Sequence, residues 1–183
     1  MITIRKFCAV SAAVVVGLTG TSTAMAKGVK EVRLQDRCDQ ATFDAVVGPG
    51  TCAPGVAEPV TFAEFAVDLN PTAFGHPKWR YSTEHIAAQP GEKIRLRSEG
   101  GEFHTFTQVA KFGGGCVDQL NIPLGLSTAP ECAVIDATGA PAWLSTGVAP
   151  GASRDVTAPT KPGSYTFQCM IHPWMRLTLD VRP

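Results

Sequence analysis

Short segments in which apolar and polar residues alternate recur from residue 78 to the end of the chain. Three of them show the pattern clearly: KIRLRS (93–98), GSYTFQC (163–169) and RLTLDV (176–181). Alternation places every second side chain on one face, as in a strand with one buried side. Tetrapeptides with proline and glycine, such as QPGE and TKPG, separate these segments and favour turns. Several short strands with turns between them predict an all-β fold, specifically an antiparallel β-sandwich.

Two short helices are expected before these strands. In the segment CDQATFDAVVG, Asp39 has the position of an N-cap, and we expect Phe43, Val46 and Val47 to lie on one face of the helix. The segment TFAEFAVDLN contains a threonine and a glutamate at the spacing of a capping box, which predicts the start of a second helix. The chain therefore has a helical part and a strand-rich part.

The domain organisation follows from this change of pattern. We interpret residues 27–59 as an N-terminal extension and residues 60–183 as a β domain. Within that domain, residues 111–150 are rich in proline and glycine and lack a strand pattern. A segment of this length without regular structure is usually functional or held by a cross-link. We therefore expect it to be an insertion.

The first 26 residues have the pattern of a secretory signal peptide. Arg5 and Lys6 precede an apolar run over residues 7–18, and small residues lead to a cleavage site near Ala26. Cys8 lies inside that run, so we expect it to be removed with the signal. The run is shorter than the roughly 20 residues of a membrane span, and no later segment is longer. These features predict a periplasmic or secreted protein without a membrane span.

The charge of the chain limits the classes of partner. The whole sequence has 16 basic and 16 acidic residues, and Arg5 and Lys6 are the charged residues of the signal, so residues 27–183 carry a formal charge of −2. This value gives no general attraction to polyanions. Nucleic acids and anionic membranes are therefore not expected partners. As a separate expectation, we take the protein to be a monomer.

The cysteines after residue 26 are odd in number: Cys38, Cys52, Cys116, Cys132 and Cys169. The first four form two local pairs, and each pair brackets a segment rich in glycine and proline. We expect the disulfides Cys38–Cys52, across the extension, and Cys116–Cys132, across the insertion. Closing a loop of this size stabilises a fold by roughly 3 kcal/mol. Cys169 is left over, either as a buried core cysteine or as a metal ligand.

The segment YTFQCMIHPWM places three potential metal ligands in one tight turn before the last predicted strand. Cys169, His172 and Met175 offer a thiolate, an imidazole and a thioether. Two histidines and one cysteine with a weak axial methionine are characteristic of an electron-transfer copper site. His104, which follows a glycine-rich turn at the start of a predicted strand, is our candidate for the second histidine. Zinc sites seldom include a thioether, so Met175 favours copper over zinc.

Each of these residues also has an ordinary structural interpretation. A lone cysteine at the end of a strand is more often a core residue, and a methionine beside a tryptophan more often packs against its ring. The joint pattern favours a metal site. We expect the other histidines, His76 and His85, to be surface or structural residues. An exported β-sandwich without a metal, in which Cys169 is a core residue, is therefore kept as an alternative to a metal protein.

The segments YTFQCMIHPWM and QPGEKIRLRSEGGEFHTFT resemble the cupredoxins, the small blue copper proteins, and in particular the amicyanin and plastocyanin group. The resemblance covers residues 78–183, except the insertion, and does not extend to the N-terminal extension. It implies a Greek-key β-sandwich that holds one type 1 copper ion. It also implies that His104, Cys169 and His172 are equatorial ligands and Met175 the axial one. An asparagine commonly follows the first histidine in this family; here that residue is Thr105, whose hydroxyl can make one such bond.

The resemblance implies a one-electron carrier that exchanges electrons transiently with redox partner proteins. The edge of His172 is then the expected electron exit. Pro173 and Trp174 are expected to form part of an apolar docking patch around it, and the alternative for Trp174 is a buried wedge that stiffens the loop. Copper delivery in the periplasm with the same ligands is the alternative function. We expect no enzymatic activity, because the four histidines of the chain include no His-x-His or His-Cys-His group for a second copper centre.

Overall fold

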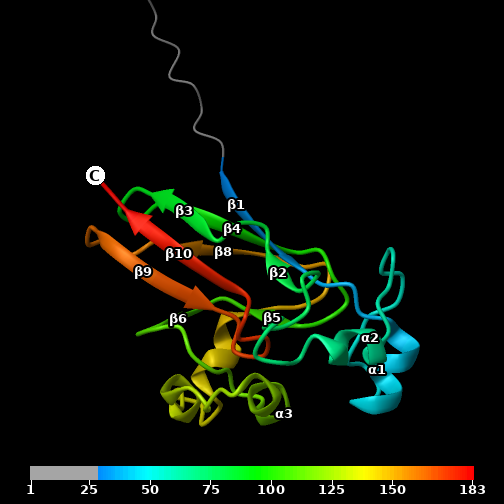
Figure 1. Cartoon of the computed structure of the whole chain (residues 1–183). Helices are drawn as coiled ribbons and strands as arrows, with labels where there is room; N and C mark the ends of the chain where they lie inside the picture. The colour runs from blue at the N-terminus through cyan, green and yellow to red at the C-terminus, as the bar shows by residue number, and fades with distance from the viewer. Residues whose placement is uncertain (1–28) are drawn as a thin grey trace, which may run out of the picture.

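The computed structural model describes residues 29–183. The expected signal peptide, including Cys8, lies outside these residues. Within them, no helix is both long and apolar enough to cross a membrane. Two four-stranded sheets form a β-sandwich, and helical segments gather at the end of the sandwich where the last strand begins (Figure 1). The predicted all-β sandwich is therefore confirmed.

The first sheet has the strand order β2-β1-β4-β8. Its strands are β1 (Lys30–Gln35), β2 (Arg80–Tyr81), β4 (Lys93–Ser98) and β8 (Ser153–Thr157). In β4 buried and exposed residues alternate strictly, and Ile94 and Leu96 face the core as the pattern predicts. β1 lies between β2 and β4 and runs parallel to β4.

The second sheet has the order β3-β10-β9-β6. Its strands are β3 (His85–Ala88), β6 (Thr107–Val109), β9 (Gly163–Gln168) and β10 (Arg176–Val181). β10 pairs antiparallel with β9 and parallel with β3. A separate two-stranded ladder joins β5 (His104–Thr105) to β7 (Gly147–Val148). The apolar faces of both sheets meet in one core, which includes Val32, Leu34, Ile94, Leu96, Phe106, Phe167, Leu177 and Leu179.

Two sequence expectations about the strands need correction. The sheets are mixed rather than antiparallel, because β1–β4 and β3–β10 are parallel pairs. The segment around His104 forms two strands instead of one: β5 pairs with β7, and β6 pairs with β9 in the second sheet. Phe106 separates them and packs into the core against Phe167, with ring centroids 4.4 Å apart. The local pattern shows a strand but not this change of partner.

Residues 27–59 supply both a strand and a helix. β1 is an inner strand, which the sequence pattern did not reveal, and helix α1 (Gln40–Val46) follows it. Asp39 caps α1 as predicted, since its carboxylate accepts a hydrogen bond from the Thr42 backbone N–H. The expected apolar face is wrong in part: Phe43 is buried, but Val46 is 61% exposed. The beginning of this segment is thus an inner strand of the first sheet.

The remaining helical segments are short. Helix α2 (Phe62–Val67) begins with the predicted capping box of Thr61 and Glu64. The expected insertion contains α3 (Asp118–Asn121) and three 3-10 helices, at Ile122–Leu124, Pro130–Ala133 and Ala142–Thr146. Both predicted disulfides, Cys38–Cys52 and Cys116–Cys132, are present, and Cys169 is the free cysteine of residues 29–183.

Candidate metal centre

Two segments bring the predicted ligands to the helical end of the sandwich. His104 begins β5, Cys169 directly follows β9, and His172 lies in the turn that leads into β10. The turn is closed by two backbone hydrogen bonds, from Cys169 N–H to the Met175 carbonyl (3.0 Å) and from Met175 N–H to the His172 carbonyl (2.9 Å). Its conformation is therefore fixed by the backbone before any metal is considered.

His104, Cys169 and His172 form a buried cluster. One side-chain nitrogen or sulfur of each residue lies within 4.8 Å of the others. The Cys169 Sγ lies 3.8 Å from His172 Nδ1, and the two imidazole centroids are 5.2 Å apart. The structure thus brings together the three residues that the sequence proposed as equatorial ligands.

The His104 Nδ1 atom shows how well this cluster suits a metal. It is buried and has no hydrogen-bond partner among residues 29–183. A buried polar atom left unpaired costs about 1–3 kcal/mol, so such atoms usually have a functional explanation. An unpaired imidazole nitrogen beside a thiol and a second imidazole is a donor set that suits copper. The residues present fit a copper ion.

Met175 lies in the same turn and is buried. It belongs to the main apolar core, together with Cys169 and Leu177. Its backbone is fixed by the hydrogen bonds that close the turn. Its role as the axial ligand stays a prediction.

The pKa values of Cys169 and His104 are shifted by burial and by neighbouring charged groups. Burial by itself raises the pKa of Cys169, but the imidazoles of His104 and His172 outweigh burial and hold the pKa well below its usual range. Burial lowers the pKa of His104, but the Asp36 carboxylate and the neighbouring Cys169 raise it to about 10. The cluster therefore favours a thiolate, which is the form of cysteine that binds metals.

Thr105 connects the two ligand loops. Its hydroxyl oxygen accepts a hydrogen bond from the Met170 backbone N–H (2.8 Å), and its own backbone N–H donates to Cys169 Sγ (3.4 Å). The Thr107 hydroxyl donates a further bond to the Thr105 hydroxyl oxygen (3.1 Å). The Thr105 hydroxyl, which stands where the family commonly has an asparagine amide, therefore makes the expected hydrogen bond. Its partner is Met170, the residue next to Cys169.

We expect Thr105→Val to lower the free energy of unfolding by about 1–3 kcal/mol, because the buried Met170 N–H loses its acceptor. Urea unfolding of the metal-free protein measures this loss. Thr105→Ser keeps the hydroxyl and should recover most of it. Thr157→Val, at an exposed position of β8, is the matched control and should change the value by less than about 0.5 kcal/mol. Equal losses for Thr105→Val and Thr105→Ser would contradict the bridging role of the hydroxyl.

The expectation that His172 exposes an edge to solvent is wrong. His172 is 1% exposed, because Trp174 from the same turn and Phe65 from α2 cover it. The rings of Trp174 and Phe65 have centroids 5.4 Å and 6.5 Å from the His172 ring. Trp174 is held in place by a hydrogen bond from its indole N–H to the Trp79 carbonyl (3.1 Å). Trp174 and helix α2 thus close the side of the cluster expected to be open.

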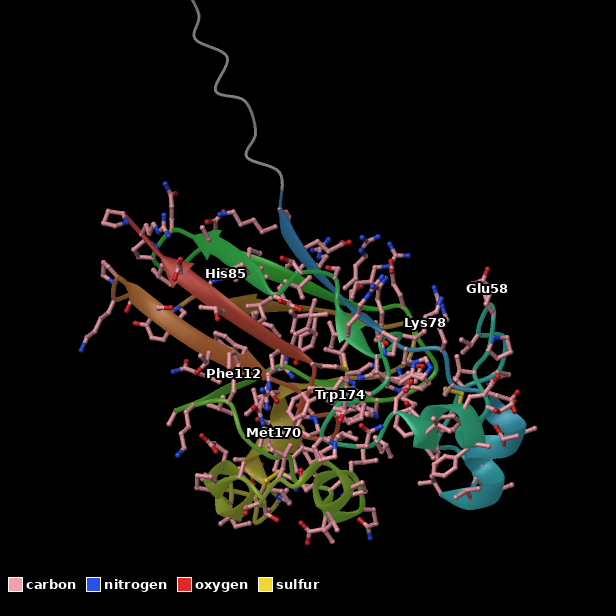
Figure 2. The ribbon with its side chains drawn as sticks, in the orientation of Figure 1. Glu58, Lys78, His85, Phe112, Met170 and Trp174 are labelled. Carbon is pink, nitrogen blue, oxygen red and sulfur yellow. A yellow bond between two sulfur atoms is a disulfide. The ribbon has the colours of Figure 1, made fainter. Side chains whose placement is uncertain are left out.

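The two remaining histidines stay outside the cluster. The Nε2 atom of His76 lies 3.7 Å from the Asp68 carboxylate, and the His76 ring packs against Trp79 with centroids 5.0 Å apart. His85 is exposed on β3, and Figure 2 shows it on the sheet, well away from the labelled Met170 and Trp174. Their interpretation as structural and surface residues agrees with these positions.

Two buried carboxylates next to the histidines were not among the candidate site residues. Asp36, directly after β1, places Oδ2 2.7 Å from His104 Nε2. Glu102 places Oε2 3.5 Å from His172 Nε2 and accepts a hydrogen bond from the Trp79 indole N–H. Glu102 lies two residues before His104, and this proximity could have identified it as a site residue. No local pattern in the sequence marks Asp36.

These carboxylates differ in their electrostatics. Burial raises the pKa of Asp36, but the hydrogen bond with His104 and those from the Gly101 and Glu102 backbone N–H groups outweigh burial and lower it. For Glu102, burial dominates and raises the pKa, although His172 and Trp79 oppose it. The negative charge beside His104 is therefore stabilised by several donors.

No protein-family model and no curated protein matches the chain. Among solved structures, it is similar to a purple cupredoxin from Nitrosopumilus maritimus, with 11% identity, a TM-score of 0.38, and coverage of 62% of this chain and 95% of that one. Amicyanin from Paracoccus versutus has 16% identity, a TM-score of 0.33, and coverage of 58% and 76%. Plastocyanin from Dryopteris crassirhizoma has 18% identity, a TM-score of 0.33, and coverage of 59% and 91%.

Proposed function

We propose that this chain is an exported one-electron carrier that holds one type 1 copper ion. His104, Cys169 and His172 would be the equatorial ligands and Met175 the axial ligand. The observation that carries the proposal is the buried cluster of two imidazoles and a thiol in which His104 Nδ1 has no partner among the described residues. Bound copper would supply a single electron by cycling between Cu(I) and Cu(II).

The role of the protein in such a carrier is to keep the ligands in place. The turn around His172 is closed by backbone hydrogen bonds, and Thr105 ties it to the loop of His104. Ligands that are buried and hydrogen-bonded move little when the charge of the metal changes. Small reorganisation of this kind favours fast electron exchange.

Trp174 is the residue that we propose as the point of electron exchange, in place of the edge of His172. It is part-exposed, packs against His172, and lines a surface groove with Phe74, Phe112 and Arg176. The Arg176 guanidinium lies 4.7 Å from the Phe74 ring centroid and 5.3 Å from that of Phe112. Transient redox interfaces are small, which is compatible with docking at a groove of this kind. Pro173, which was expected in this patch, is buried.

Copper delivery is the alternative function with the same ligands. The side chains of His104, Cys169 and His172 are all buried, and transfer of the ion to an acceptor needs ligands that a second protein can reach. Burial therefore favours the electron carrier. Two disulfides also support an oxidising compartment, in agreement with export.

The spectrum of the copper-loaded protein tests the proposal. Addition of copper to the purified protein should give an intense visible absorption from charge transfer between the Cys169 thiolate and copper. Cys169→Ser should abolish this band and leave the fold intact, because the hydroxyl can still accept the hydrogen bond from the Thr105 N–H. Met170→Leu is the matched control: Met170 is equally buried but packs with Val109 and Ala129, so the band should remain. A colourless protein that still binds copper would overturn the proposal.

A further inference from the structure

We propose that Asp36 and Glu102 are positioning residues that hold the outer nitrogens of the two histidines and set the reduction potential of the bound metal. This inference rests on the proposed function, because it takes the metal to be copper. Each carboxylate faces the Nε2 atom of one histidine, so that the Nδ1 atoms are left for the cluster. The two residues come from different segments of the chain, and neither contributes an atom to the cluster of His104, Cys169 and His172.

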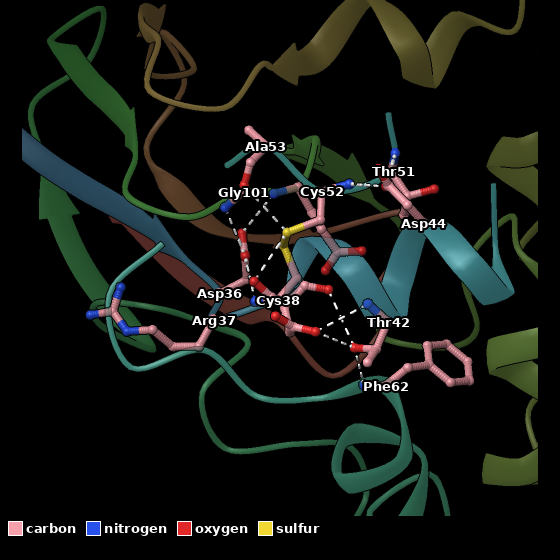
Figure 3. The surroundings of a disulfide bond; sticks show 12 residues. Asp36, Arg37, Cys38, Thr42, Asp44, Thr51, Cys52, Ala53, Phe62 and Gly101 are labelled. Atoms are coloured by element: carbon pink, nitrogen blue, oxygen red, sulfur yellow. Dashed lines mark hydrogen bonds between the residues drawn. A yellow bond between two sulfur atoms is a disulfide. The ribbon is translucent and has the colours of Figure 1, made fainter. Parts of the chain in front are cut away.

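Asp36 is held by donors on every side. Its Oδ1 atom accepts hydrogen bonds from the backbone N–H groups of Gly101 (2.8 Å) and Cys38 (3.2 Å) (Figure 3). Its Oδ2 atom accepts one from the Glu102 backbone N–H (3.1 Å). Because the carboxylate can only accept, the proton in its bond with His104 lies on Nε2. The Nδ1 atom of a neutral His104 is then unprotonated, as a metal ligand must be.

Glu102 repeats this arrangement more weakly at His172. Its side chain is buried, and the Trp79 indole N–H fixes the carboxylate in place. The distance to His172 Nε2 is 3.5 Å, compared with 2.7 Å between Asp36 and His104. Charge-assisted hydrogen bonds are stronger at shorter distances. We therefore assign the larger effect on the metal to Asp36.

A buried negative charge beside a ligand favours the metal state with the higher positive charge. A carboxylate that accepts the outer N–H of a ligating histidine also raises the basicity of the nitrogen that binds the metal. Both effects stabilise Cu(II) relative to Cu(I) and lower the reduction potential. Loss of such outer partners typically changes metal affinity 10–100-fold.

Three variants of the copper-loaded protein test this inference. Asp36→Asn removes the charge and keeps the volume, and it should weaken the preference for Cu(II) by about 10–100-fold. This change raises the potential by about 60–120 mV, at 59 mV for each tenfold in a one-electron couple. Glu102→Gln should raise it less. Asp155→Asn is the charge-matched control and should leave the potential unchanged, because Asp155 lies on β8 in an exposed ion pair with Arg95 of β4.

A second measurement uses the metal-free protein. Nitrogen-15 NMR of the imidazoles should show that the His104 Nε2 atom carries a proton and that this proton exchanges slowly with solvent. Asp36→Asn should speed that exchange. A wild-type His104 whose Nε2 carries no proton would overturn the inference even if Asp36→Asn does not fold. An unchanged potential in Asp36→Asn would do so as well. A wild-type protein that binds copper without a visible band would instead contradict the proposed function. Failure of this inference and failure of the proposed function are therefore distinguishable.

Discussion

Replacing Phe43 by alanine should lower the free energy of unfolding by about 3–5 kcal/mol, the usual cost of truncating a buried phenylalanine. Phe43 lies on α1 and is 1% exposed. Its ring stacks on Trp79, with centroids 5.7 Å apart, and it also contacts Phe65 at 5.4 Å. These rings belong to the same core as the inner faces of the two sheets. The loss should therefore affect the whole fold and not only the N-terminal segment.

This prediction decides whether residues 27–59 fold as an extension or as part of one domain. Urea unfolding of the metal-free protein, followed by tryptophan fluorescence and by circular dichroism, should show one transition whose midpoint falls in Phe43→Ala. Val46→Ala, on the exposed side of the same helix, should change the free energy by less than about 0.5 kcal/mol. A second transition whose midpoint is the same in Phe43→Ala and wild type would show that the segment unfolds separately.

Features that the sequence predicts well are those with a local signal. Alternation of apolar and polar residues placed Ile94 and Leu96 on the buried face of β4, and the capping box of Thr61 and Glu64 located the start of α2. Cysteine spacing predicted both disulfides, since each closes a short loop. The close spacing of Cys169 and His172 predicted two members of the cluster, because both residues lie in one turn.

Features that depend on distant pairing were missed. β1 is six residues long, and it is recognisable as an inner strand only from its parallel pairing with β4, far along the chain. The mixed direction of the sheets has the same origin, because alternation is identical in parallel and antiparallel strands. Val46 was misplaced because α1 has only seven residues and packs mainly through Phe43.

The surroundings of the cluster were also beyond a local pattern. His172 was expected to be exposed, but Phe65 of α2 and Trp174 cover it. Asp36 reaches His104 because β1 lies in the first sheet, so an error about one strand hid a partner of a ligand. The chemistry of a site can therefore be inferred from its ligands, whereas solvent access and tuning depend on segments that lie elsewhere in the sequence.

Removal of the Cys38–Cys52 disulfide should affect both stability and the cluster. The double variant Cys38→Ala/Cys52→Ala should lower the free energy of unfolding by roughly 3 kcal/mol, as expected for a closed loop of this length. The sulfurs also pack against Gly101: a Cβ atom there would lie 2.6 Å from Cys38 Sγ and 2.7 Å from Cys52 Sγ. Since Gly101 N–H donates to Asp36, loss of the sulfurs should loosen the carboxylate beside His104.

The double variant Cys116→Ala/Cys132→Ala separates these two effects. It opens a loop of similar length, but its sulfurs belong to a smaller apolar cluster with Val109 and Met170. We expect a similar loss of stability with little change in the solvent exchange of the His104 Nε2 proton. The Cys38→Ala/Cys52→Ala variant should show faster exchange of that proton, measured by NMR on the metal-free protein. Equal exchange rates in the two variants would mean that the first disulfide stabilises the fold without supporting Asp36, and that the donors to its carboxylate are held by β1 and the loop of Gly101 alone.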